Sequence, residues 1–219
     1  MKKILLSFVC LFCFSQAYSQ DSEQGNWLIY IGSKKIDEQW NWHHEIQYRN
    51  YNFIGDLEQL LIRTGIGYNL SPKNNNLLLG YGFIQSEPYI AGTDEKARVI
   101  EHRIFQQFIT KQTFGRFSLQ HRYRIEERFI EDDFKLRFRY FLAFNIALNK
   151  PEMGPKTWYL SAYNELFING QAAVFDRNRI YGALGYQINS QIKAELGYMS
   201  QVYEKNSREQ LQMVVFANF

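Results

Sequence analysis

Along most of this chain, charged or polar residues alternate one by one with apolar or aromatic residues. The stretch HRYRIEERF, which begins at His121, shows this alternation clearly. In a helix, Arg122, Arg124 and Arg128 would be scattered around the cylinder, whereas in a β-strand they share one face and the apolar residues occupy the other. A period of two residues therefore predicts a strand with one ionic face and one apolar face.

The same alternation recurs from Asn26 to the end of the chain. We count about eleven such segments, mostly of about 10 to 14 residues, whereas strands of soluble proteins usually have about 5 or 6. Short turns such as Asn189-Ser190 separate some of them, and longer loops such as 87–96 separate others. This order predicts an all-β, antiparallel, up-and-down meander, and closure into a barrel would remove its exposed edges.

Two closed barrels fit this pattern. A soluble, lipocalin-like barrel turns its apolar face inward, whereas an outer-membrane barrel turns it toward lipid and encloses the ionic face. Strand length favours the membrane barrel, because about 9 to 11 tilted residues cross a bilayer. Aromatic residues such as Trp40 and Trp158 near segment ends resemble interfacial girdles, and Phe219 closes the last strand as in the assembly signal of such barrels. We therefore predict an antiparallel transmembrane β-barrel.

The number of strands is expected to be even. Single-chain bacterial barrels have even strand numbers, which leave both termini in the periplasm. We expect ten strands if the segment Asn26–Ser33 lies outside the wall, or twelve if two short strands have been counted as one.

The first residues have the features of a secretory signal peptide. Lys2 and Lys3 precede the apolar stretch Ile4–Phe14, and small residues follow at Ala17 and Ser19. The stretch is much shorter than the roughly 20 residues of a membrane-spanning helix. We expect cleavage near Ser19, which makes residues 1–19 the signal peptide and residues 20–219 one exported barrel domain.

Composition excludes several function classes. Cys10 and Cys13 both lie in the signal peptide, so the exported chain has no disulfide, no reactive thiol and no acylated cysteine. The formal net charge of the whole chain is only +3, which argues against a nucleic-acid partner. His43 and His44 project to opposite faces, and no metal site or cofactor is expected.

The ionic face supplies the candidate site. In a narrow barrel these charges must pair or stay hydrated, either as a structural network that plugs the lumen or as a narrow, porin-like, slightly anion-selective pore for small anionic solutes. If the connection after Phe129 is a tight hairpin, Glu126 lies opposite Arg137. The lumen-facing network comprises Glu45, Arg49, Arg63, Glu101, Arg103, Arg122, Arg124, Glu126, Arg128, Arg137, Arg139, Glu165, Arg177, Arg179, Lys193 and Glu195.

Two other functions remain open. A lipid-modifying enzyme of the outer membrane would need a serine, a base and an orienting acid on the apolar face. His102 and His121 fall on that face, but Ser118 and Ser161 point inward, so no catalytic residue is assigned. A soluble periplasmic lipid-binding barrel is the other alternative, and it would extract into buffer without detergent.

Several short segments resemble a known group of proteins. They are Glu101-His102-Arg103, Gln106-Gln107, Arg122 to Arg128, Tyr163-Asn164-Glu165-Leu166-Phe167, Asn178-Arg179-Ile180-Tyr181, Gly185-Tyr186 and Phe219. With these segments the chain is similar to uncharacterised families, filed as domains of unknown function, of small outer-membrane β-barrels common in Bacteroidetes-type bacteria. The resemblance implies a Gram-negative outer membrane, with its lipid and the barrel assembly machinery as partners and Phe219 as the assembly signal, and it implies no reaction.

Overall fold

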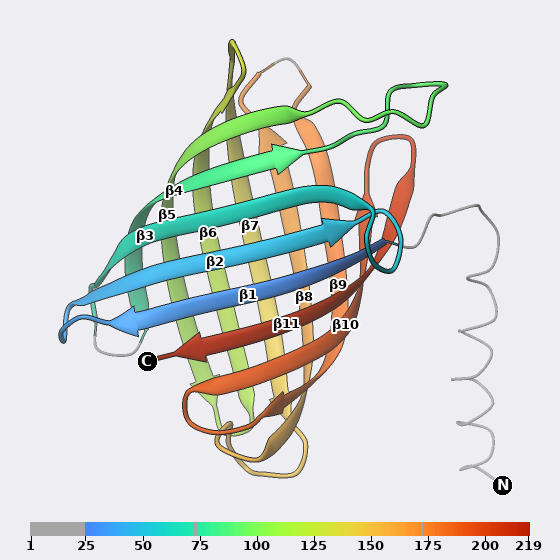
Figure 1. Cartoon of the computed structure of the whole chain (residues 1–219). Coiled ribbons are helices and arrows are strands. Elements are labelled where there is room, and N and C mark those ends of the chain that lie inside the picture. The colour runs from blue at the N-terminus through green and yellow to red at the C-terminus, as the bar shows by residue number, and fades with distance from the viewer. Residues whose placement is uncertain (1–24, 72–73, 172) are drawn as a thin grey trace, which may run out of the picture.

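The chain forms a barrel built from β-strands alone. A computed structural model describes residues 25–71, 74–171 and 173–219, and within these ranges eleven strands close into one barrel (Figure 1). The all-β class and barrel closure expected from the alternation are thus confirmed. The expected signal peptide, with both cysteines, lies outside the described residues. In the described ranges no helix is long and apolar enough to cross a membrane.

The strands follow one another around the wall in chain order. Each one pairs with its chain neighbours in antiparallel register, as the meander predicts. They are long, from 11 residues in β1 to 16 in β5. Their bounds are β1 Gly25–Lys35, β2 Trp40–Asn50, β3 Leu57–Asn69, β4 Asn75–Ser86, β5 Val99–Phe114, β6 Phe117–Ile130, β7 Asp133–Ala147, β8 Thr157–Asn169, β9 Phe175–Gln187, β10 Ile192–Val202 and β11 Ser207–Asn218.

The hairpin between β6 and β7 sets the register of the most charged part of the wall. Only two residues separate these strands, and the first of them, Glu131, has a φ of 52°. Such left-handed backbone is typical of two-residue hairpin turns. With this turn, Glu126 and Arg137 are paired across the ladder, which confirms the predicted cross-strand pair.

The barrel is closed by β1 and β11, which run in parallel and lie side by side (Figure 1). Their register extends from Gly25 opposite Gln210 to Ser33 opposite Asn218. The ladder continues at Phe219, whose N–H donates to the Ser33 carbonyl over 2.9 Å. Every edge is therefore paired, although a parallel ladder is slightly weaker than an antiparallel one.

The expected even strand number is wrong for the described barrel, which has eleven strands rather than ten or twelve. The segment Asn26–Ser33 belongs to the wall as part of β1 because its alternate side chains, Trp27 and Ile29, pack inside the barrel. An odd number forces β1 and β11 to run the same way. Hence β1 begins at one end of the barrel, here called the N-terminal end, and β11 finishes at the other, the C-terminal end.

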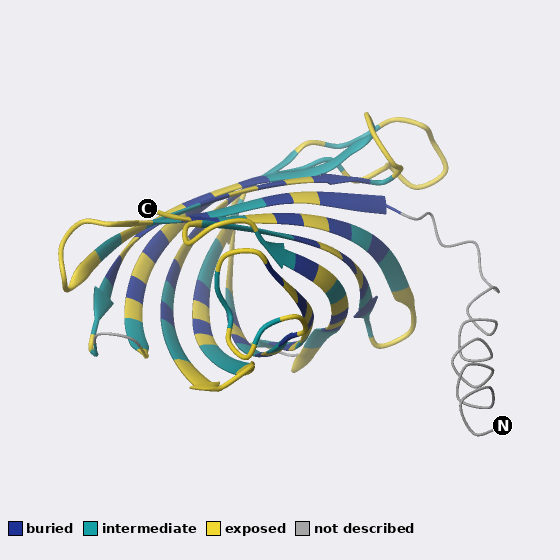
Figure 2. Cartoon of the chain, turned by 90° about the horizontal axis from the view of Figure 1, so that it is seen from below, coloured by how far each residue is buried: buried dark blue, intermediate teal, exposed yellow. Residues whose placement is uncertain are grey.

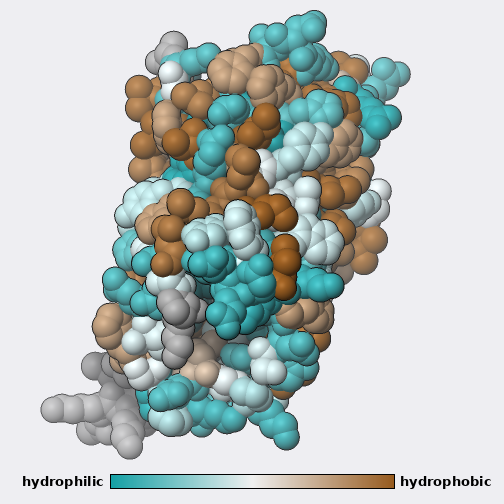
Figure 3. All heavy atoms as spheres, turned by 90° about the vertical axis from the view of Figure 1, so that its left-hand side faces the viewer, coloured by the Kyte–Doolittle hydropathy of each residue, from teal (hydrophilic) through white to brown (hydrophobic). Residues whose placement is uncertain are grey.

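Burial alternates along each strand with the period of the sequence (Figure 2). The outward residues are largely aliphatic and aromatic, and Leu28, Ile62 and Leu196 are 43–55% exposed. Figure 3 shows hydrophobic side chains gathered over the upper part of one face of the molecule. A large contiguous apolar surface of this kind is unusual for a soluble monomer.

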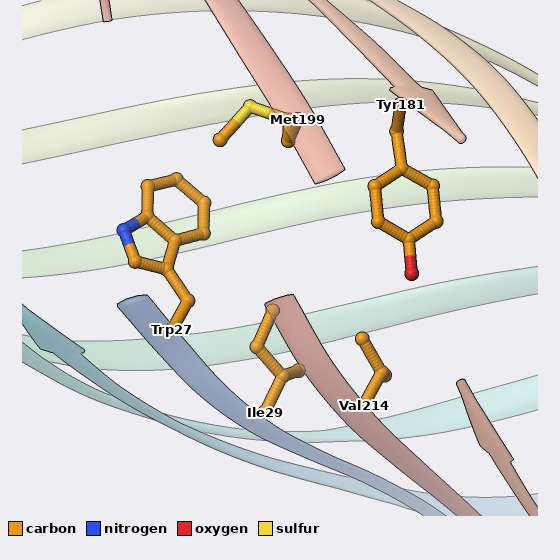
Figure 4. Packing of buried hydrophobic residues seen from close by; sticks show 5 residues of the cluster. All are labelled: Trp27, Ile29, Tyr181, Met199 and Val214. Atoms are coloured by element: carbon orange, nitrogen blue, oxygen red, sulfur yellow. The ribbon is translucent and has the colours of Figure 1, made fainter. Parts of the chain in front are cut away.

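The inner wall also holds one apolar cluster beside the β1–β11 seam. Trp27, Ile29, Tyr181, Met199 and Val214 meet there from β1, β9, β10 and β11 (Figure 4). All five are at most 9% exposed. This packing adds side-chain contacts to a seam whose two strands are far apart in sequence.

Candidate functional site: the charged lumen

All sixteen residues of the predicted ionic face lie on the inward side of the wall. Twelve of them are buried, and the remaining four, Arg122, Arg128, Arg177 and Lys193, are half-buried. Ionised side chains are costly to bury without partners. The contacts of these residues therefore determine what the lumen can do.

Glu126 is the centre of the network. Its side chain is fully buried, and its two oxygens accept hydrogen bonds from Arg137 at 2.6 Å and Arg139 at 2.7 Å. One carboxylate is thus shared by five guanidinium groups within 4.0 Å. The other three are Arg103 at 3.4 Å, Arg124 at 3.6 Å and Arg63 at 3.9 Å.

Glu165 on β8 forms the second centre, two strands farther around the wall than Glu126 on β6. Arg122 and Arg139 both donate to Glu165 Oε1 at 2.6 Å, and Arg179 approaches Oε2 at 3.7 Å. Because Arg139 contacts both Glu165 and Glu126, the two carboxylates belong to one connected network. Charge-assisted hydrogen bonds to arginine are among the stronger polar contacts in proteins.

Two further carboxylates extend the network toward opposite ends of the barrel. Glu101 accepts from Arg103 at 2.5 Å and from Arg128 at 2.7 Å. On β2, Glu45 accepts from Arg63 at 2.9 Å. The predicted lumen set is therefore largely brought together into ion pairs.

Arg49 and Arg177 lie apart from these clusters. Arg49 stacks on the Trp27 ring, 3.8 Å from its centroid, and donates to Gln47. Arg177 donates to Asp176 at 3.0 Å and packs 5.0 Å from the Tyr203 ring. A cation–π contact contributes about 0.5–1 kcal/mol at an exposed site and about 2 kcal/mol or more at a desolvated one.

Sequence reasoning missed the neutral members of the site. Gln107 accepts from Arg124, Gln201 accepts from Arg179 at 2.7 Å, and the rings of Phe105 and Phe167 lie under several guanidinium groups. The glutamines share the inward period of the charges, so the alternation carried a signal for them. The alternation gave no signal for the two phenylalanine rings, because an aromatic residue on the inward face departs from the expected ionic pattern.

The N-terminal half of the lumen is filled by side chains. Phe105 and Phe167 are at most 1% exposed there, among the arginines around Glu126. Polar contacts join strands that are not neighbours, as between Arg137 of β7 and Asp176 of β9 at 3.1 Å, and between Arg208 of β11 and Glu58 of β3 at 2.6 Å. We call this part the closed half.

The C-terminal half contains a cavity of about 610 Å³, here called the vestibule. The network forms its floor, through Arg124 and Glu165 among others, and asparagines such as Asn41 and Asn145 line its sides. Among the described residues, eight lysines and arginines and three glutamates line it. The cations are Lys35, Arg63, Lys111, Arg122, Arg124, Arg139, Arg179 and Lys193, and the glutamates are Glu45, Glu165 and Glu195.

Three histidines lie on the outward face, each beside a tyrosine. The tyrosine hydroxyl is 2.9 Å from the ring nitrogen in the Tyr30–His44 pair, 2.6 Å in the Tyr81–His102 pair and 2.9 Å in the His121–Tyr140 pair. Within the described ranges, no hydrogen bond joins a serine hydroxyl to a histidine, and no three histidine, aspartate or glutamate side chains gather as metal ligands. In each pair the tyrosine hydroxyl gives one nitrogen of the histidine ring a hydrogen-bond partner on the apolar face.

The fold and its interior define the class of protein: a closed β-barrel whose inward face carries a network of ion pairs. Residues 24–212 match the family described as "Protein of unknown function (DUF2490)". The chain belongs to this family. The family description, like the resemblance noted in the sequence, names no reaction or ligand.

One curated relative is similar over most of the chain. It is an uncharacterized protein of Methylorubrum extorquens, 32% identical over 169 residues, which cover 72% of this chain and 69% of the relative. No solved structure matches the chain.

Proposed function

We propose that this protein is a bacterial outer-membrane β-barrel with a plugged lumen, exported with a signal peptide that is cleaved near Ser19. The observation that carries the proposal is the direction of the two faces. Apolar side chains such as Leu28, Ile62 and Leu196 point outward from the wall, while Glu126 and its arginines are enclosed. Such a barrel is stable in lipid, where the strands need no water to satisfy their backbone groups.

The contents of the lumen favour a plugged barrel over a freely open pore. Phe105, Phe167 and the ion pairs around Glu126 fill the closed half. Breaking one buried ion pair by removing a partner costs about 3–5 kcal/mol. Opening a path for solutes would require several such contacts to separate together, so the resting barrel should not conduct.

The test is conductance of the purified protein after refolding into planar bilayers, with folding checked by gel mobility before and after heating. We expect insertion without stepwise current. Steps of open-channel current from folded protein would contradict the plug, and protein that stays soluble without detergent would contradict the membrane assignment.

A narrow anion-selective channel is the second candidate, because cations outnumber carboxylates in the vestibule. Excess positive charge in a confined space attracts anions. If current is observed, the replacement of both Arg122 and Arg124 by alanine should weaken anion selectivity. Unchanged selectivity in that variant would exclude the vestibule as the filter.

The other two functions have less support. A soluble lipid carrier needs an apolar interior, but buried charged side chains such as Arg124, Glu126 and Arg139 lie inside this barrel. A lipid-modifying enzyme needs a nucleophile beside a base. Among the described side chains His102 and His121 contact tyrosines instead, and His121→Ala should leave any lipid-directed activity of the protein unchanged.

A further inference from the structure

We propose that the vestibule binds one phosphate-class oxyanion, either free inorganic phosphate or the phosphate group of a small organic solute. This inference rests on the proposed function only in that it assumes the folded barrel. The evidence for the anion site is the cavity, its excess of positive charge and the arginine N–H groups that lack hydrogen-bond partners.

The charge of the vestibule is not balanced by the protein itself. Eight lysines and arginines line it, against three glutamates, among the described residues. Glu126, which contacts three of these arginines, is already shared by five arginines in all. Positive charge in a confined, partly desolvated cavity is strongly stabilised by a bound anion.

Arg124 is the clearest sign of a ligand position. It is only 3% exposed and lines the vestibule floor. Its Nε and Nη2 atoms both donate to the single oxygen Gln107 Oε1, while Nη1 has no hydrogen-bond partner and lies 3.6 Å from Glu126. A buried charged donor without an acceptor is costly. An oxyanion at the vestibule floor would supply that acceptor once the guanidinium turns toward the cavity.

Neighbouring groups on the same floor have spare donors as well. Arg63, which is 5% exposed, uses Nη1 for Glu45, but its Nε has no hydrogen-bond partner. Arg122 donates to Glu165 through Nη2 and likewise leaves its Nε without a partner. Three arginines that line one cavity thus each keep a buried N–H without a hydrogen-bond partner.

Guanidinium groups select the chemistry of the ligand. Their planar forks match the oxygens of phosphate and carboxylate, and phosphate offers several strong acceptors to several arginines at once. The cavity of about 610 Å³ has room for a phosphate carried on a small organic group. A multiply charged oxyanion is therefore the occupant that best satisfies three separate arginines.

The test is isothermal titration of inorganic phosphate into refolded protein in a nonionic detergent, at constant chloride concentration. We expect saturable binding at one site, and Arg124→Gln should weaken it at least about tenfold. Arg208→Gln is the matched control, because Arg208 pairs with Glu58 outside the vestibule, and it should change affinity less than about twofold.

A second arm separates the sources of phosphate. Tighter binding of glycerol 3-phosphate than of inorganic phosphate would assign the site to a phosphate monoester, and equal binding would assign it to the free ion. If Arg124→Gln does not fold, Lys111→Gln at the half of the vestibule away from the floor serves instead, with a several-fold loss expected.

Two results would overturn the site: no saturable binding to the unmodified protein, or the same loss in Arg208→Gln as in Arg124→Gln. Flotation of the same preparation with phospholipid vesicles keeps this outcome separate from the proposed function. Protein that floats with the vesicles but does not bind phosphate would contradict only the anion site. Protein that binds phosphate but does not float would contradict the membrane assignment.

Discussion

The two halves of the lumen are built from the same residue types but differ in packing. In the closed half, the buried rings of Phe105 and Phe167 support arginines that share Glu126. In the vestibule, the cations outnumber the carboxylates and border a cavity. An alternating ionic face can therefore pack as a core at one level of a barrel and line a cavity at another.

The largest expected effect follows from removing the shared carboxylate of the closed half. Glu126→Gln leaves five buried guanidinium groups without their common counter-ion, and we expect a loss of about 3–5 kcal/mol in the free energy of unfolding. Urea unfolding of protein refolded into vesicles measures it.

The matched change in the vestibule is Lys193→Gln. The Lys193 ammonium is 3.9 Å from Glu195 and partly exposed, so its loss should change the unfolding free energy by less than about 1 kcal/mol. Equal losses of unfolding free energy in Glu126→Gln and Lys193→Gln would mean that the two halves are packed alike, which would contradict the structure.

A smaller effect is expected where a ring lies directly on the backbone. A Cβ at Gly80 would be 2.3 Å from Cζ of the buried Phe105 ring in the closed half. Gly80→Ala should therefore cost about 1–3 kcal/mol through overpacking. At the outward Gly182 a Cβ meets nothing within 4 Å, and Gly182→Ala is expected to stay within about 0.5 kcal/mol of the unmodified protein in the same unfolding assay.

The smallest effect concerns the loops that border the closed half. Asp56, between β2 and β3, accepts from Lys96 and from the Tyr89 hydroxyl. Burial alone would raise the pKa of Asp56, but these donors outweigh it and hold the pKa below its ordinary value of 3.8. A lowered folded pKa means that the contact stabilises the loops above the unfolded-state pKa and is lost as pH falls through the lower folded value.

Hydrogen exchange between pH 7 and pH 2 tests this coupling. Protection in loops 51–56 and 87–98 should fall only in the acid range, below about pH 4. In Asp56→Asn the acid-induced step should be absent. A step that persists in this variant would assign the loss of protection to other groups.

The alternation of the sequence predicts most of the fold. The inward set, the antiparallel meander, barrel closure and the Glu126–Arg137 register all follow from the period of two and one short hairpin. Each depends on residues that are near one another in the chain, and local patterns encode such contacts well.

The features that escaped prediction depend on residues far apart in the chain. The parallel β1–β11 seam joins the first strand to the last, and no local pattern shows the direction in which they meet. The same holds for Arg208 and Glu58, and for the stacking of Arg49 on Trp27. Side chains that extend across the barrel decide which half of the lumen is filled. The alternation shows only which face a residue occupies, so it does not predict these contacts.

The central claim is that the outward apolar face meets lipid, and spin labels at single cysteines test it most directly. The chain after Ser19 contains no cysteine, so labels can be placed singly at the outward Ile62 and Leu196 and at the inward Ser161. In refolded vesicles we predict that the two outward labels collide often with oxygen and are shielded from a water-soluble nickel chelate. The label at Ser161 should collide with oxygen less often than the outward labels. Outward labels that collide freely with the nickel chelate would contradict the claim.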